Sequence, residues 1–138
     1  YLDSIDFIDS LDVSYLHVFT YSERPNTHAL GLGPIVEKNE RKRRTQHYRM
    51  LSNKKRRAFD LSHMHTTRDV LFESNPKNNL LQGWSDNYIR VAIPYVQDFE
   101  NRIVSMPLVN YSTEGCYLEH MTTEQLEEQC TIDSLIDF

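Results

Sequence analysis

Hydroxyl, carboxylate, guanidinium and amide side chains follow one another directly after an apolar stretch of the chain. The apolar stretch, Val13 to Tyr21, is rich in β-branched and aromatic residues, which is typical of a strand covered on both faces. In α/β sheets, ligands bind where strands end at such polar loops. The position therefore predicts a ligand site in this loop. Its polar residues are Ser22, Glu23, Arg24, Asn26 and Thr27.

A second group of residues suits the binding of a polyanion. Residues 37–57 hold ten of the fifteen Lys and Arg residues against two Glu, a local charge of +8 in a chain whose net charge is −5. Solvation of a helix face alone usually mixes charges of both signs. The unmixed run therefore favours nucleic acid as a partner over a merely solvated face. The cations expected on this face are Lys42, Arg43, Arg49, Lys54, Arg56 and Arg57.

Trp84, Tyr88 and Arg90 form a third group, of the kind that contacts the bases of single-stranded or loop RNA. For Trp84, which follows Gly83, a place in the core is an equal alternative. Tyr88 and Ile89 face opposite ways in a strand, so one of them points outward. Residues 66–121 carry a net charge of −3, so this region alone should bind RNA weakly, and the basic segment must supply much of the attraction.

No metal site or catalytic residue is assigned. Cys116 and Cys130 lie fourteen positions apart without a further ligand at metal-binding spacing, which predicts two plain thiols. His63 and His65 lack a third ligand and are interpreted as residues at the end of a helix. The apolar runs are far shorter than the roughly 20 residues of a membrane span, and no signal peptide pattern is present. The default location is therefore cytoplasmic.

The elements that position these groups begin with an amphipathic helix, because apolar residues recur every three positions from Leu2 to Leu11. This helix and the strand after it form a single helix–strand unit, which cannot bury its own strand. We therefore expect the rest of a larger domain on the N-terminal side. A long helix from Val36 to about His65 follows, free of Gly and Pro. Its expected packing stripe comprises Tyr48, Leu51, Ala58 and Phe59.

The second half of the chain reads as short strands separated by turn signals. The segments are RDVLFES, NLLQGWSDN, YIRVAIPY, NRIVSMPLVNY and GCYLEHM. Five strands in so short a region predict a small antiparallel β-barrel of the oligonucleotide-binding kind. After them, Thr122 with Gln125 suggests a capping box, and Met121 with Leu126 a hydrophobic staple. The acidic C-terminal segment is expected to dock on the larger domain, and the alternatives are a mask over the basic helix or a partly disordered end.

Three segments resemble, in order, parts of the radical SAM methylthiotransferases. SYLHVFTYSERPNTHA resembles the last strand and following loop of their catalytic barrel, and EKNERKRRTQHYRMLSNKKRRAF resembles their basic connecting helix. TTRDVLFES and GWSDNYIRVAIP are similar to their TRAM domain, a small RNA-binding barrel. The sequence HVFTYS most resembles that of the branch acting on threonylcarbamoyladenosine in tRNA. The resemblance implies four regions. Residues 1–35 form the end of the radical SAM α/β barrel and residues 36–65 form the basic connecting helix. Residues 66–121 form the TRAM barrel, and residues 122–138 form an acidic helix or tail.

The resemblance implies a parent enzyme that adds a 2-methylthio group to a modified adenosine beside the tRNA anticodon. Such enzymes use S-adenosylmethionine and two 4Fe–4S clusters. This chain contains no CxxxCxxC triplet, so by itself it is expected to be inactive and to hold no cofactor. Its expected role in the parent enzyme is to help hold tRNA. The alternative function is a non-enzymatic RNA- or protein-binding adaptor module. As a protein adaptor it would dock its partner through the barrel and the tail, and the basic helix would be a solvated spacer.

The resemblance also assigns the polar loop. Ser22, Arg24 and Thr27 match the family's loop at the open end of the barrel, where Arg24 would meet an anionic group of S-adenosylmethionine or tRNA. A loop-stabilising ion pair of Arg24 is the alternative. Asn26 stands where the family usually has Gly, and Asn tolerates the left-handed backbone that such a turn requires.

Overall fold

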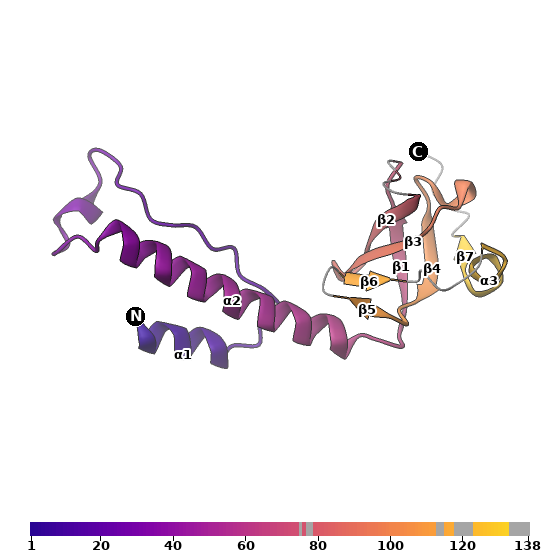
Figure 1. Cartoon of the computed structure of the whole chain (residues 1–138), viewed down its shortest axis with the longest axis horizontal. Coiled ribbons are helices and arrows are strands. Elements are labelled where there is room, and N and C mark those ends of the chain that lie inside the picture. Colours follow the sequence, from indigo (N-terminus) through magenta and orange to yellow (C-terminus); the bar gives the residue numbers. More distant parts are fainter. Residues whose placement is uncertain (75, 77–78, 113–114, 118–122, 133–138) are drawn as a thin grey trace. The chain divides into compact units, whose positions relative to one another are not determined.

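The computed structural model describes residues 1–74, 76, 79–112, 115–117 and 123–132 (Figure 1). The chain divides into two compact units, Tyr1–Phe59 (unit 1) and Asp60–Phe138 (unit 2). The division falls inside the long helix α2, Lys38–Ser62. No helix in the described residues has the length and apolarity needed to cross a bilayer.

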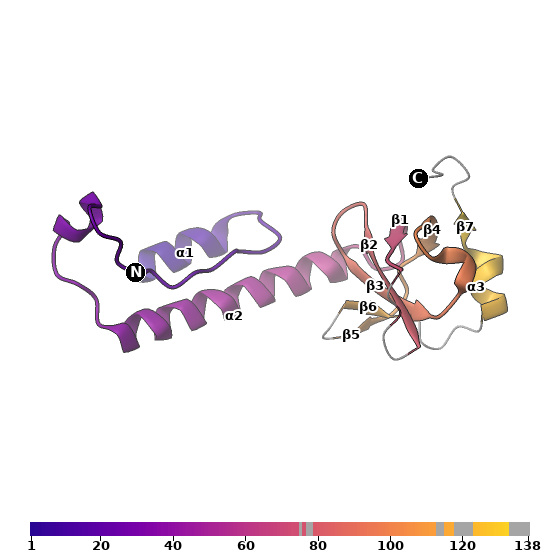
Figure 2. The same ribbon diagram turned by 90° about the horizontal axis from the view of Figure 1, so that it is seen from above.

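Unit 1 contains the two expected helices and an extended segment. Helix α1, Leu2–Ser10, buries Ile5 and runs alongside α2 (Figure 2). A short 3-10 helix, η1, covers His28–Gly31. Helix α2 confirms the long basic helix, with ends two and three residues inside the expected ones.

The strand expected over residues 13–21 is wrong. The segment is extended but makes no ladder with any described residue. Leu16 and Val18 are half-buried, whereas Val13 and Tyr15 are exposed and Phe19 is 84% exposed. The alternation of a strand is therefore present, but a strand also requires a neighbour that shares its hydrogen bonds. The end of an α/β barrel is accordingly not seen in unit 1.

The packing face of α2 is more polar than the expected stripe. Leu51 is buried, but Ala58 is exposed and was wrongly placed on this face. Thr45 and Ser52 are buried in their stead. The Thr45 hydroxyl lies 3.0 Å from the Thr20 hydroxyl, and the Ser52 hydroxyl bonds to backbone groups of the extended segment, which have no strand partner. The Ser52 hydroxyl accepts a hydrogen bond from the Leu16 N–H at 2.9 Å and donates to the Leu16 carbonyl at 3.1 Å.

Unit 2 is built on a mixed sheet. The strands are β1 (Thr67–Phe72), β2 (Leu80–Ser85), β3 (Arg90–Pro94), β4 (Ile103–Pro107), β5 (Tyr111–Ser112), β6 (Gly115–Tyr117) and β7 (Thr131–Ile132). Their order is β5-β6-β3-β2-β1-β4-β7. The four longest strands pair antiparallel and confirm four of the expected segments. These four strands contribute the following buried side chains to the core: Val70, Phe72, Leu81, Val91, Ile93, Val104 and Met106.

The expectation of five antiparallel strands needs correction. The described residues form seven strands, and β6 pairs with β3 in the parallel direction. The parallel pair arises because β5 and β6 form a hairpin, of which β6 lies against the free edge of β3. The pairings among the described residues do not join β5 to β7, so they do not close the sheet into a barrel.

Two helical segments complete unit 2. The 3-10 helix η2 covers Gln97–Phe99, and α3 covers Thr123–Gln129. Helix α3 confirms a helix in the acidic C-terminal segment, and its Leu126 is fully buried. The expected capping residue Thr122 and staple residue Met121 lie outside the described residues, as does the end of the chain from residue 133.

Candidate functional site

Arg41 ties the polar loop of unit 1 to α2. Its guanidinium donates hydrogen bonds to the Tyr21 carbonyl at 3.2 Å, to the Val36 carbonyl at 2.5 Å and to Glu23 Oε1 at 2.5 Å. The hydrogen bond from Arg41 lowers the pKa of the Glu23 carboxyl to about 2. One side chain, only 11% exposed, thus holds both ends of the loop. Sequence reasoning missed Arg41 because it was counted only as one cation among ten.

The spacing of α2 contained a signal for this role. Arg41 lies four residues before Thr45, which in turn lies seven before Ser52, so all three share one helix face. A polar face at helical spacing beside an extended segment indicates hydrogen bonds to that segment. Arg41 belongs to that face rather than to the solvated one.

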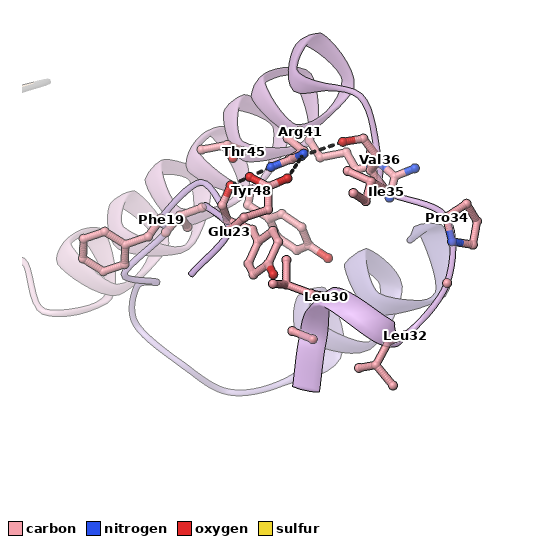
Figure 3. Close-up of a pocket in the computed structure, with 15 residues that line it drawn as sticks. Phe19, Glu23, Leu30, Leu32, Pro34, Ile35, Val36, Arg41, Thr45 and Tyr48 are labelled. Carbon is pink, nitrogen blue, oxygen red and sulfur yellow. Dashed lines mark hydrogen bonds and ion pairs between the residues drawn. The ribbon is translucent and has the colours of Figure 1, made fainter. Parts of the chain in front are cut away.

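A pocket of about 350 Å³ opens beside Arg41. Its walls are mainly apolar and include Leu30, Ile35 and Val36, with Leu30 across the pocket from Arg41 (Figure 3). The Arg41–Glu23 pair forms its polar side (Figure 3). Because the two charges satisfy each other, the pocket suits an apolar group rather than an ion.

The structure separates the three loop residues predicted to meet a cofactor. Thr27 Oγ1 donates to the Arg24 carbonyl at 2.9 Å, so these two share an exposed turn. Asn26, between them, has φ 61° and confirms the expected left-handed conformation. Ser22 lines another hollow, together with Lys38 and Lys42 among others. Arg24 makes no ion pair within the part of the chain that the structure describes.

The predicted cationic surface of α2 is partly neutralised. Arg43 Nε lies 2.7 Å from Glu40, and Lys54 Nζ lies 3.1 Å from Asp9. Hydrogen bonds from Arg43 and then from Arg44 lower the pKa of the Glu40 carboxyl to about 2. The expectation of an unmixed charge is thus wrong for these two cations, because α1 and the first turn of α2 bring carboxylates to them.

The other predicted cations differ in their surroundings. Lys42 and Arg49 are exposed and form no ion pair with any described residue. The Arg56 guanidinium lies 5.3 Å from the centre of the Tyr15 ring, and Arg57 is exposed. Lys and Arg exceed Asp and Glu by four in unit 1, whereas unit 2 carries a net charge of −9. Unit 1 is therefore the more favourable unit for a polyanion, and Lys42 and Arg49 are exposed cations of its helix α2.

The turn between β2 and β3 presents Tyr88. The Ser85 hydroxyl accepts a hydrogen bond from the Ile89 N–H at 2.8 Å and donates to Asn87 Oδ1 at 2.7 Å. Within this turn Tyr88 has φ 65° and is 70% exposed, whereas Ile89 is fully buried. Of the two residues that sequence left open, Tyr88 is therefore the outward one.

Trp84 lies on the outer face of the sheet and not in the core. It is 41% exposed and pairs directly with Arg90 in the β2–β3 ladder. The Arg90 guanidinium lies 5.9 Å from the centre of the indole ring and donates to Gln82 Oε1 at 2.5 Å. The sheet therefore brings Trp84 and Arg90 together, as a cation beside an aromatic face.

The 4Fe–4S clusters implied by the resemblance do not fit these residues. The described residues contain no group of three or more His, Cys, Asp or Glu placed to hold a metal ion. Cys130 is half-buried, and burial raises the pKa of its thiol to about 11. Iron is ligated by thiolate, which this environment disfavours. His63 and His65 lie just past the end of α2, and the side chain of Cys116 is outside the described residues.

Comparison with known proteins gave two curated relatives. The threonylcarbamoyladenosine tRNA methylthiotransferase MtaB of Bacillus subtilis (strain 168) is 24% identical over 113 residues, which cover 79% of this chain and 25% of the relative. The protein of the same name from Aquifex aeolicus (strain VF5) is 35% identical over 57 residues, 41% of this chain and 14% of the relative. No family model matches the chain. The relatives confirm the resemblance found in the sequence, and the chain spans about a quarter or less of their length.

Proposed function

We propose that this chain, which is similar to threonylcarbamoyladenosine tRNA methylthiotransferases, is the part of such an enzyme that holds tRNA. The observation that carries the proposal is the exposed positive charge of α2, with Lys42 and Arg49 outside any ion pair of the described residues. Phosphate groups bind such side chains with release of counterions. The parent enzyme would add a 2-methylthio group to a modified adenosine next to the anticodon.

The paired cations of α2 are compatible with this role. Arg43 and Lys54 face carboxylates at the surface, where an ion pair contributes only about 0–1 kcal/mol. A tRNA phosphate can therefore replace Glu40 or Asp9 at little cost. Binding should be dominated by the phosphate backbone and should weaken steeply with salt.

The extended segment of unit 1 supports a place at the end of the radical SAM barrel of the parent. Residues 13–21 are extended, make no ladder with any described residue and carry exposed apolar side chains such as Val13, as expected of a strand whose neighbours lie elsewhere in the parent. Paired in that way, residues 13–21 would become the strand that the sequence predicts. The regions 1–35, 36–65, 66–121 and 122–138 remain our proposed division of the chain.

The loop after this segment would then stand at the open end of that barrel. Ser22, Arg24 and Thr27 would contact S-adenosylmethionine there, with the Arg24 guanidinium placed to pair with an anionic group. S-adenosylmethionine supplies the methyl group and the radical chemistry when it is bound. The clusters must be held by other residues of the parent, because those described here do not fit them.

Binding of a tRNA transcript to the chain at several salt concentrations tests the proposal. Replacing Lys42 and Arg49 together by Gln should make the slope of log affinity against log salt less steep by about 1.4–1.8, since each phosphate contact contributes about 0.7–0.9. Arg102→Gln removes one positive charge from unit 2 and should leave the slope unchanged. Equal affinity and slope for the double variant and the unmodified chain would contradict the proposal.

A non-enzymatic adaptor remains the second candidate, because the apolar pocket beside Arg41 also fits a docked protein side chain. The nucleosides of tRNA separate the two functions. Mass spectrometry of tRNA from cells lacking the gene should show the loss of a 2-methylthio adenosine if the parent is the enzyme. Unchanged nucleosides would favour the adaptor.

A further inference from the structure

We propose that the β2–β3 hairpin of unit 2 stacks unpaired RNA bases, so that unit 2 recognises bases while α2 recognises phosphates. The inference rests on the proposed tRNA binding and specifies the chemistry of a second contact surface. We call this surface the stacking face; it comprises Leu71, Trp84, Tyr88, Arg90 and Ile103.

The register of the sheet aligns four members of the stacking face in one row. Ile103 of β4 pairs with Leu71 of β1, Leu71 pairs with Trp84 of β2, and Trp84 pairs with Arg90 of β3. Directly paired residues lie on the same face of a sheet. Leu71 is 47% exposed, and Arg90 is exposed beside Trp84. The outer sheet surface thus carries an apolar row that ends in an aromatic ring and a guanidinium.

The hairpin tip holds a residue whose backbone conformation is unfavourable for it. Five described residues other than Gly have positive φ, and three of these are Asn, which adopts the left-handed region readily. Tyr88 has the largest side chain of the five, and its bulk makes the conformation costly. The hydrogen bonds of Ser85 hold the turn in place. Gly or Asn would fit the backbone of the turn better, so the backbone conformation does not explain a Tyr at this position.

The charges around the hairpin indicate a flat and uncharged ligand. Unit 2 carries a net charge of −9, which repels a phosphate backbone. Arg68 on β1 lies 3.5 Å from Asp86 and is offset by it. A base that stacks on Trp84 keeps its phosphate at a distance, and Arg90 adds a cation–π contact. Bases within a duplex are already stacked, so the ligand is an unpaired base.

The experiment compares the whole chain with variants of Tyr88. Single-stranded oligoadenylate should quench the fluorescence of Trp84, the one tryptophan of the chain, whereas the same strand paired with oligouridylate should quench it far less. Tyr88→Gly should weaken the binding of oligoadenylate roughly 5- to 150-fold, the range that corresponds to the loss of one stacked base. The same variant should raise the thermal midpoint of unit 2, because Gly adopts positive φ without strain. A purely structural role of Tyr88 would move stability and binding in the same direction.

Two variants serve as controls. Tyr88→Phe keeps the ring and should keep the affinity. Asn101→Gly places Gly at another described position of positive φ in unit 2, where φ is 53°, and should leave binding unchanged. Trp84→Leu, followed with fluorescently labelled oligoadenylate, should weaken binding at every salt concentration without changing the salt slope, whereas Lys42→Gln should change the slope.

The outcomes separate this inference from the proposed function. If the Tyr88→Gly and Trp84→Leu variants bind RNA as tightly as the unmodified chain, and single and paired strands bind alike, the stacking face does not stack bases. The inference is then overturned, while the proposed binding of tRNA by α2 stands. If the unmodified chain binds neither oligoadenylate nor a tRNA transcript at low salt, both proposals fail. Loss of affinity with a raised midpoint supports the inference.

Discussion

Replacing Gly83 by Ala tests how closely β1 and β2 approach each other. A Cβ atom at this position would lie 2.5 Å from the Leu71 carbonyl oxygen and 2.9 Å from side-chain carbons of Val70 and Phe72. The carbonyl belongs to the backbone of β1 and cannot rotate away without breaking the ladder, so the two strands must separate. Overpacking of a core costs about 1–3 kcal/mol, and the contact with backbone indicates the upper end, about 3 kcal/mol.

Urea denaturation followed by Trp84 fluorescence measures this loss. Trp84 is the next residue in β2 and therefore reports on the strand that is perturbed. With a slope of about 1–2 kcal/mol per molar urea, the midpoint of unit 2 should fall by about 1.5–3 M. Gly31→Ala is the matched control, because a Cβ there meets no atom within 4 Å; its effect on stability should stay within about 0.5 kcal/mol. A urea midpoint of the Gly83→Ala variant equal to that of the unmodified chain would refute the register of β1 and β2.

Two further predictions concern unit 1. The pKa of Glu23 is lowered from 4.5 to about 2 in the folded chain. Its pair with Arg41 therefore stabilises the fold above about pH 4.5, and this contribution is lost as the pH falls toward 2. Glu23→Gln should remove part of the loss of helix that circular dichroism records over that pH range, and an acid titration identical to that of the unmodified chain would contradict this prediction. Ser52→Ala leaves the Leu16 N–H and carbonyl without their partner and should cost about 1–3 kcal/mol in thermal unfolding of unit 1, whereas a loss below about 0.5 kcal/mol would show that water replaces the hydroxyl.

Local patterns in the sequence were sufficient for much of the molecule. The three-residue recurrence from Leu2 predicted α1, and the absence of Gly and Pro after Val36 predicted α2, since helix formation depends on neighbours along the chain. Alternating β-branched and aromatic residues predicted β1 to β4. The segregation of cations into residues 37–57, and the motif HVFTYSERPNTHA, which led to the tRNA methylthiotransferases, also required no structure.

Contacts between distant residues decided the rest. Residues 13–21 have the pattern of a strand, but pairing depends on a neighbour that the pattern cannot name, and the segment instead lies against Thr45 and Ser52 of α2. Arg41 and Arg43 are both cations of one helix, yet Arg41 is used to tie a loop and Arg43 meets Glu40, because side-chain partners are set by packing. The outward position of Trp84 was likewise settled by the sheet. Secondary structure and net charge follow from short-range chemistry, whereas exposure and ion pairing depend on which surfaces the folded chain brings into contact.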